Sequence, residues 1–387
     1  MAHEMTPGVR DLHISGGDSH KGCPVGRFYL SRVWAQSFVV LGEELIESLE
    51  FSRSIRSWLS GGHLESHVVD SPGGSRKAVD DQDRKQWLEV LRSTPSRLKA
   101  LLEGVPRSVA LWAPAPGKWS ILEIVCHMRD MEREAYLARY ERILAEDEPR
   151  LPDVDGDVYS LELDYRAEAL VPVLREWARL RRESLRLLSR VKGPGWDRAG
   201  VHETAGRLSM AGFLRRHAVG NDEAHLGQIE AIKRRHALLA RLEGAPARLA
   251  KALGALPAEA VRRPPEPGQW APVEIACHLR DADRVSAERV SKMAFSDRPT
   301  LWMMDNARLA ERLRYREADL QAVLKEHRRR REGLVSLLRA LPDGAWQRTG
   351  IHPKRGELTI EALAGLVADH DDGHLSRIEA QGRTYSK

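Results

Sequence analysis

Three histidines in the last third of the chain have the types and spacing of a metal site. His370 and His374 are four residues apart, so a helix would present both on one face, and His278 falls on another expected helix. Imidazole nitrogens suit zinc, nickel, copper and iron, and three of them leave a coordination position open for water or a substrate atom. Each histidine alone is better explained as a hydrogen-bonded core residue or a solvated one. Together they predict a divalent metal that acts as a Lewis acid.

Two carboxylates near these histidines are the candidate catalytic residues. Asp281 comes three residues after His278, and Asp371 directly follows His370. Either could accept a hydrogen bond from an imidazole and orient it, or act as a general base near bound water. The alternative is that both are ordinary charges on helix surfaces.

An earlier segment carries a weaker version of the same pattern. His127 and His225 are its candidate metal ligands, whereas Asn221 stands where the triad has a histidine. An amide is a poor ligand beside imidazole for these metals, so this site should bind weakly or be vestigial. His217 lies two helical turns from His225, about 12 Å in a regular helix, which is too far to share an ion.

The segment before His225 is not equal in length to the matching segment before His374. The segment from Ser209 to His225 is one residue longer than the segment from Thr359 to His374. A helix can absorb one extra residue as a π-bulge, which would change the direction of the side chains that follow.

Two further motifs point to structure rather than chemistry. Cys126 and Cys277 each precede a histidine, but neighbouring helical residues point about 100° apart, so a buried packing role is expected. Arg328–Arg331 is the densest basic run, and on a long helix such a run is expected to mark a solvated face.

An internal repeat explains why the histidine pattern occurs twice. Pro-Gly-Lys-Trp119 recurs 151 residues later as Pro-Gly-Gln-Trp270, and His225-Leu-Gly-Gln-Ile229 recurs as His374-Leu-Ser-Arg-Ile378. The repeat predicts two copies of one fold, at residues 83–236 and 237–387. Residues 1–82 have no counterpart and are expected to be an extension that is partly disordered or helical.

Apolar residues within each copy recur at helical spacing, and no alternating strand pattern competes. Ser120 with Glu123 has the pattern of a capping box, Pro272 suits a first helical turn, and Ser209 and Thr359 are N-cap candidates. We therefore predict an all-α protein made of two tandem up-down four-helix bundles. The expected helices cover residues 83–104, 120–145, 164–190, 209–236, 237–255, 271–294, 311–341 and 359–381.

Composition limits the classes of protein that the chain could be. Of 387 residues, 42% are hydrophobic and 30% are charged, which is typical of a globular protein and excludes disorder over most of the length. No apolar stretch approaches the ~20 residues of a membrane span, and three cysteines without a leader pattern indicate a cytoplasmic protein. The net charge of +5 comes from interleaved signs, so nucleic acid is not an expected partner.

Three motifs stand out in the second copy. They are Pro272-Val-Glu-Ile-Ala-Cys-His278 after Trp270, Gly350-Ile-His352-Pro-Lys-Arg-Gly-Glu-Leu-Thr359, and Ala368-Asp-His370-Asp-Asp-Gly-His374-Leu. Together they resemble the motifs of a known family, the DinB-like superfamily of four-helix bundle proteins. The resemblance covers the second copy from end to end, and the first copy departs from it at Asn221.

This resemblance implies a divalent metal, often zinc or nickel, held by His278, His370 and His374. It also implies relatives that act as thiol-dependent S-transferases or isomerases, with a low-molecular-weight thiol as co-substrate, or as metal-dependent hydrolases. We therefore expect an enzyme that acts on a small electrophilic molecule, and the sequence leaves open whether the chain forms a homodimer. The alternative is a non-enzymatic tandem-bundle scaffold or a sensor of metal or ligand.

Overall fold

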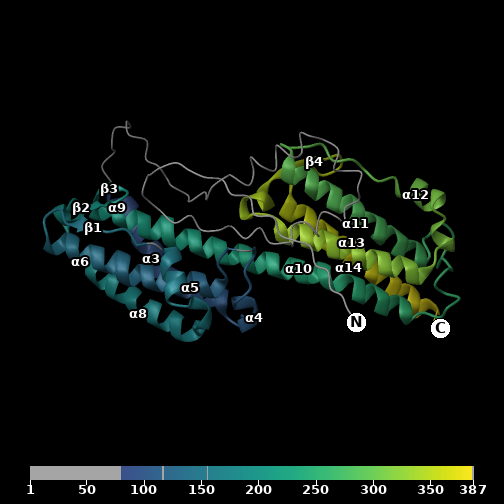
Figure 1. The fold of residues 1–387 in the computed structure, drawn as a ribbon, viewed down its shortest axis with the longest axis horizontal. Coiled ribbons are helices and arrows are strands. Elements are labelled where there is room, and N and C mark those ends of the chain that lie inside the picture. Colours follow the sequence, from purple (N-terminus) through teal and green to yellow (C-terminus); the bar gives the residue numbers. More distant parts are fainter. Residues whose placement is uncertain (1–79, 116, 155, 386–387) are drawn as a thin grey trace, which may run out of the picture. The chain divides into compact units, whose positions relative to one another are not determined.

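Two four-helix bundles follow one another along the chain, which confirms the predicted all-α tandem architecture (Figure 1). The structure is a computed structural model that describes residues 80–115, 117–154 and 156–385. The prediction for the extension, residues 1–82, lies outside the described residues except for its last three. None of the helices within the described ranges is long and apolar enough to cross a membrane.

The first bundle consists of four helices, two of which contain a π-helical stretch. Its elements are α3 (Asp81–Leu102); α5 (Ile121–Asp130), η2 (Met131–Leu137) and α6 (Ala138–Ala145); α8 (Leu170–Leu188); and α9 (Met210–Arg215), η5 (Arg216–Glu223) and the first part of α10 (Ala224–Gly254). The single turn α4 (Arg107–Ala110) precedes α5.

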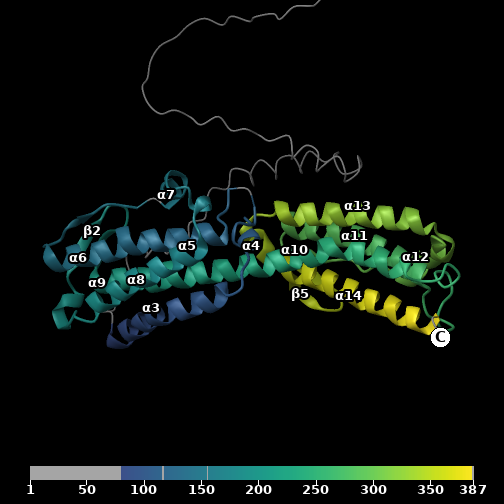
Figure 2. The same ribbon diagram turned by 90° about the horizontal axis from the view of Figure 1, so that it is seen from below.

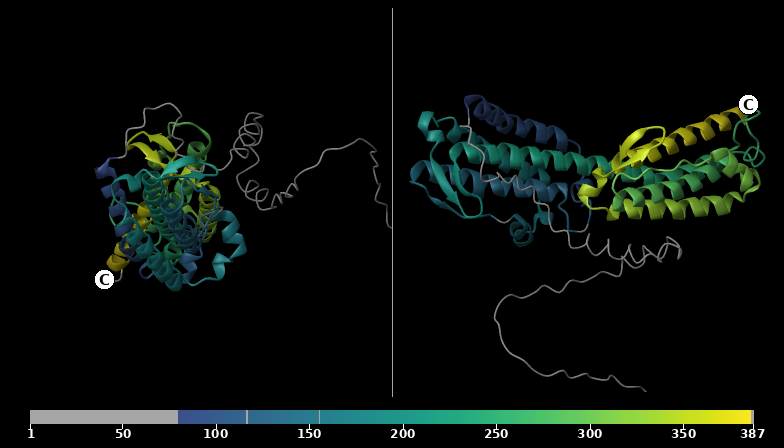
Figure 3. Two further views of the ribbon diagram at one scale, coloured as in Figure 1. Left: turned by 90° about the vertical axis from the view of Figure 1, so that its left-hand side faces the viewer. Right: turned by 90° about the horizontal axis from the view of Figure 1, so that it is seen from above.

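The second bundle repeats this arrangement with uninterrupted α-helices. Its helices are the second part of α10, α11 (Pro272–Phe295), α13 (Leu320–Ala340) and α14 (Ile360–Tyr385). These four run lengthwise beside one another in the perpendicular views (Figure 2, Figure 3).

One helix, α10, contributes to both bundles. We predicted separate helices at residues 209–236 and 237–255, and that boundary is wrong because α10 continues unbroken from Ala224 to Gly254. Residues 236–243 contain neither glycine nor proline, and they include the buried residues Leu239 and Leu242. Nothing in this stretch stops a helix, and its apolar residues have a core to pack against.

A crossover connection changes the predicted order of helix directions. The end of α10, the start of α11, the start of α13 and the end of α14 share one apolar cluster, so α11 and α13 run in the same direction. A strict up-down order is therefore not followed here. The connecting chain pairs Thr300 with Ile351 at the far end of the bundle and returns through α12 (Asn306–Arg312). The first copy makes the matching connection through α7 (Gly156–Glu162).

This connection also explains why the third helix of each copy begins later than predicted. We expected helices at residues 164–190 and 311–341, whereas α8 begins at Leu170 and α13 at Leu320. Asp164 and Arg314 have φ values of 43° and 49°, in the left-handed region. A right-handed helix cannot pass through such a residue, so the chain turns there before the long helix starts.

Short strands precede the last helix of each copy, and the sequence did not predict them. β2 (Ala199–His202) pairs antiparallel with β3 (Gly206–Ser209), and β4 (Thr349–His352) pairs with β5 (Gly356–Thr359). β1 (Arg150–Leu151) adds a parallel strand beside β2. Strands of four residues are too short to show a recognisable alternation of apolar and polar residues, so the sequence pattern does not indicate these hairpins.

The predicted caps are confirmed. The Ser120 hydroxyl accepts from the backbone N–H of Glu123, whose carboxylate accepts from Ser120 N at 2.8 Å. Ser209 Oγ and Thr359 Oγ1 accept the backbone N–H three residues on, at 3.1 and 3.0 Å, and Pro272 is the first residue of α11. These bonds satisfy N–H groups that lack helical acceptors.

A buried arginine joins all four helices of the second bundle at its middle. Pro246 in α10 has no N–H, so the carbonyl of Leu242, four residues earlier, loses its helical donor. Arg331 Nη1, from α13, donates to that carbonyl at 3.2 Å. The same guanidinium pairs with Asp283 of α11 at 2.7 Å and with Asp371 of α14 at 2.5 Å.

The first bundle has the same combination of a helical proline, a buried arginine and two carboxylates. Pro95 in α3 frees the Leu91 carbonyl, which accepts from Arg181 Nη1 of α8 at 3.3 Å. Arg181 also pairs with Glu132 at 2.7 Å and with Asp222 at 2.5 Å. In each copy one arginine therefore supplies the donor that a helical proline removes, and it holds two carboxylates from other helices.

We predict that Arg331→Met destabilises the second bundle by about 3–5 kcal/mol, because it leaves Asp283 and Asp371 buried without their cation. Arg328→Met, at an exposed position one turn earlier on α13, is the matched control and should change stability by less than about 0.5 kcal/mol. Urea unfolding followed by circular dichroism measures both. Equal destabilisation by the two variants would contradict the role assigned to Arg331.

Candidate metal centre

Two helices position the three histidines of the second copy. Pro272 begins α11, and the Glu274 carboxylate accepts from Ala271 N at 2.8 Å, which stabilises the first turn. His278 follows about one turn after Glu274 on α11. His370 and His374 lie one turn apart on α14, and the contacts between α11 and α14 bring the two helices together.

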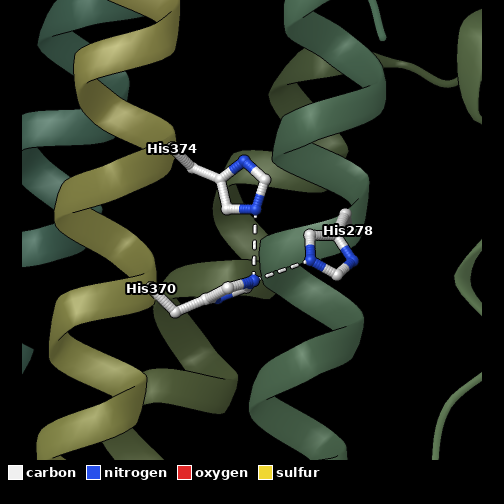
Figure 4. A group of neighbouring side chains, drawn as sticks. All are labelled: His278, His370 and His374. Atoms are coloured by element: carbon white, nitrogen blue, oxygen red, sulfur yellow. Dashed lines mark hydrogen bonds between the residues drawn. The ribbon is translucent and has the colours of Figure 1, made fainter. Parts of the chain in front are cut away.

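The three imidazoles point their Nε2 atoms toward one another (Figure 4). His370 Nε2 lies 2.9 Å from His278 Nε2 and 3.1 Å from His374 Nε2. Among the described residues, only these three form a group of histidine, cysteine or acidic side chains with the geometry of a metal site. The structure thus brings together the predicted triad.

The spacing and hydrogen bonding of this cluster fit a metal ion. With zinc–nitrogen bonds of 2.0–2.1 Å, two nitrogen ligands lie about 2.9 Å apart at a right angle and about 3.3 Å apart at the tetrahedral angle. Without an ion, each choice of imidazole tautomers leaves at least one N–H group without a hydrogen-bond acceptor. Protons on the Nδ1 atoms of His278 and His374 find no acceptor, because both atoms are buried without a partner, and protons on their Nε2 atoms compete for one lone pair of His370.

Burial keeps these imidazoles neutral. It lowers the pKa of His278 to about 4, with a further contribution from His370. It lowers the pKa of His374 to about 3, aided by the neighbouring imidazoles, and it also lowers the pKa of His370. Near neutral pH the nitrogen lone pairs are therefore available, and binding a cation requires no loss of protons.

The two candidate catalytic carboxylates lie elsewhere than expected. Asp281 accepts from Tyr315 Oη at 2.6 Å and is paired with Arg280 and Arg330. Asp371 is buried and bonded to Arg331. Among the described residues, hydrogen bonds from the three imidazoles reach neither carboxylate. Guanidinium groups bind carboxylates more strongly than a neutral imidazole does, and they occupy these oxygens.

Arg331 was not among the predicted site residues, and the interpretation of Arg328–Arg331 as a solvated face is wrong for this residue. The side chain of Arg331 is only 1% exposed. The signal was present in the helical pattern, because Arg331 falls on the stripe of buried residues Val323, His327, Leu334 and Leu338. A charged residue on an apolar stripe calls for buried partners of opposite charge.

The first copy brings together both of its candidate ligands, His127 and His225. The rings of His127 and His225 are 5.0 Å apart between centroids. Asn221 turns away and donates to the Asp222 carboxylate at 3.3 Å. Gly156 packs against the His127 ring so closely that a Cβ there would lie 2.5 Å from its atoms. Gly156 therefore fills the space beside His127, and among the described residues no third histidine joins His127 and His225.

The extra residue before His225 is absorbed in the way the sequence left open, as η5, a π-helical stretch at Arg216–Glu223. It takes up the extra residue, so Asp222 still reaches Arg181 and His225 still lies beside His127. His217, which helical spacing puts too far away to share an ion with His225, lies 2.8 Å from Glu132 and belongs to the buried ionic network. Both cysteines are buried, as predicted.

Comparison with known proteins identifies the fold family of both copies. A family model described as the DinB superfamily matches residues 83–229 and 241–378, which together make up more than half of the chain. The two matched regions fall within the two copies predicted from the repeat.

Curated relatives match over shorter segments. The protein named "Putative metal-dependent hydrolase YfiT" from Bacillus subtilis (strain 168) is 26% identical over 85 residues, 22% of this chain and 47% of the relative. The "Putative metal-dependent hydrolase" from Geobacillus thermodenitrificans (strain NG80-2) is 26% identical over 93 residues, 24% of this chain and 52% of the relative. The chain spans about half the length of these curated relatives.

A solved structure is also similar to part of the chain. It is described as "YfiT from Bacillus subtilis is a probable metal-dependent hydrolase with an unusual four-helix bundle topology". The similarity has a TM-score of 0.40 at 21% identity and covers 42% of this chain and 93% of that chain.

We predict that His327 makes the stability of the second bundle depend on pH. Burial and the nearby charges of Arg331 and Arg330 lower the pKa of His327 to about 3, against about 6.5 in an unfolded chain. The unfolded state alone gains this proton as pH falls below 6.5, so the contribution of His327 to stability is lost between pH 6.5 and 3 and is unaffected above pH 6.5. Burial raises the pKa of the Asp283 carboxyl, 3.3 Å from His327 Nε2, to about 7, so proton uptake by Asp283 in the folded state acts in the opposite direction.

Between pH 7 and pH 4.5 this residue should account for about 2–3 kcal/mol of lost stability. Urea unfolding of chelator-treated protein at both pH values measures the loss. His327→Gln should remove this loss from the change in stability between the two pH values, whereas His236→Gln, at a half-buried position on α10, should leave that change unaltered. An unaltered difference in His327→Gln would show that His327 does not titrate in this way.

Proposed function

The chain belongs to the DinB superfamily, and from that premise we propose that it is a metal-dependent enzyme whose reaction centre lies in the second copy. His278, His370 and His374 hold a divalent metal, zinc or nickel, and the substrate is a small electrophilic molecule. The single observation that carries this proposal is the convergence of three Nε2 atoms, 2.9 and 3.1 Å apart around His370, from two helices.

The residues of the chain prepare the centre in three ways. Burial keeps the imidazoles neutral, so their lone pairs are free to bind a cation. The Arg331–Asp371 ion pair holds α14 at the residue between the two histidine ligands of that helix. The Trp270 ring lies 4.9 Å from the His278 ring and covers one side of it. Asp281 and Asp371 then serve as positioning residues rather than as bases, because arginines occupy their oxygens.

Three neutral histidine ligands leave one coordination position of a bound metal open for the nucleophile, and this determines the proposed chemistry. A metal bound there supplies the charge that lowers the pKa of a water or thiol nucleophile toward neutrality. The names of the curated relatives support water, and hence hydrolysis. A low-molecular-weight thiol, which the family resemblance implies, is the other nucleophile, and it would make the enzyme an S-transferase or isomerase.

We predict that protein purified without a polyhistidine tag, stripped with chelator and reloaded with zinc or nickel binds about one ion per chain. Elemental analysis after gel filtration measures this ratio. His374→Ala should lose most of the metal, since two imidazoles remain. His225→Ala, the matched change in the first copy, should retain the full ratio. Wild-type protein that retains no metal after reloading would end the proposal.

The nucleophile can be identified with the reloaded protein. We predict turnover of p-nitrophenyl acetate if the nucleophile is water, or of 1-chloro-2,4-dinitrobenzene with a small thiol if it is a thiol. His374→Ala should lower the rate at least about 100-fold, because one ligand of the activating metal is removed. Metal binding with neither reaction, together with a rise in melting temperature, would indicate a metal sensor instead.

A further inference from the structure

The face of α14 that carries the histidine ligands continues as a polar stripe beyond them. His370, His374, Arg377 and Gln381 are separated by four, three and four residues, so all four lie on one face of the helix. Arg377 is about 4.5 Å beyond His374 along the helix axis. Gln381 follows one turn later.

Both residues of this extension have unused hydrogen-bonding capacity. Gln381 is buried; its Nε2 donates to the Trp270 carbonyl at 3.2 Å, but its Oε1 is buried with no donor. Arg377 is exposed, and no described residue forms a hydrogen bond or ion pair with it. A buried amide oxygen without a donor is costly, so a donor from outside the chain would be favoured there.

Arg377 differs in this respect from Arg280, Arg316 and Arg330, which are paired with carboxylates. Arg280 and Arg330 both pair with Asp281, and Arg316 pairs with Glu274. The charge of Arg377 instead acts on the imidazoles: after burial, it is one of the causes that lower the pKa of His278, His370 and His374. An uncompensated cation therefore lies within electrostatic reach of the whole triad.

The first copy shows that this stripe is not a requirement of the fold. Its residues at the corresponding positions are Gln228 and Ile232. The Gln228 Oε1 accepts from His225 Nδ1 at 3.2 Å, and Ile232 is part of the apolar core. The bundle thus forms with neutral or apolar residues here, and the guanidinium and the unpaired amide oxygen occur in the copy that has the three-histidine cluster.

We propose that Arg377 binds an anionic oxygen group, such as a carboxylate, of the molecule that reacts at the histidine cluster, and that Gln381 Oε1 accepts an N–H or O–H from the same molecule. The inference rests on the proposed function and narrows its substrate to small anions. The anionic group lies within about one helical turn of the reacting atom, because Arg377 is one turn from His374.

Two thiols of equal length, one charged and one neutral, test this assignment. The full chain is loaded with Co²⁺, and mercaptoacetate or 2-mercaptoethanol is titrated against the sulfur-to-cobalt charge-transfer absorption. Wild-type protein should prefer mercaptoacetate at least about tenfold over 2-mercaptoethanol, since hydrogen bonds between charged groups contribute this much or more.

Arg377→Gln, which installs the residue of the first copy, should abolish this preference, whereas 2-mercaptoethanol, which carries no anionic group, should still bind. Arg377→Lys should keep part of it, and Arg284→Gln, at an exposed position on α11, should keep all of it. An equal preference in wild type and Arg377→Gln would overturn the role of Arg377 and leave the metal centre standing. Failure of wild type to bind Co²⁺ would overturn both proposals.

Discussion

Arg331 and Arg181 each solve a problem that a proline creates in the neighbouring helix. A proline inside a helix leaves one carbonyl without its donor, and a buried guanidinium requires anions and acceptors around it. In each copy the two needs are met together, because one arginine donates to the free carbonyl and pairs with carboxylates from two other helices. In the second copy one of these carboxylates belongs to Asp371, which directly follows His370 on α14. The position of the imidazoles therefore depends on this ionic network.

The two copies separate what the fold requires from what the candidate chemistry requires. Both copies have the arginine, the proline and the two carboxylates. The first copy also contains a π-helical stretch, with which the ion pair between Asp222 and Arg181 is retained. The cluster of three nitrogens is different: in the first copy Asn221 donates to Asp222, and Gly156 packs on His127. A bundle can therefore be stable without the cluster. Packing alone does not explain why the second copy keeps three neutral imidazoles with two unpartnered Nδ1 atoms.

Much of the site could be predicted from short-range rules. His370 and His374 share a face because of helical periodicity, and the one-residue difference before His225 made a π-bulge one of the possible outcomes, because helices can absorb an insertion in that way. Arg331 was missed because a run of four arginines was taken as one surface, whereas each residue of a helix faces its own direction. The crossover before α13 and the four-residue strands carry too little local pattern to be recognised.

By itself, the sequence determined that both copies are helical, where the helices after Ser120, Ser209, Ala271 and Thr359 begin, and that the fold occurs twice, because these properties depend on neighbours a few residues apart or on direct repetition. Only the tertiary structure decided that His278 meets His370 and His374, that arginines and not imidazoles hold Asp281 and Asp371, and that α10 is shared by both copies. The physical reason is that helix packing sets these relations between residues far apart in the chain. Where the packed helices meet, the burial of charge and the competition between donors for each carboxylate decide which side chains pair.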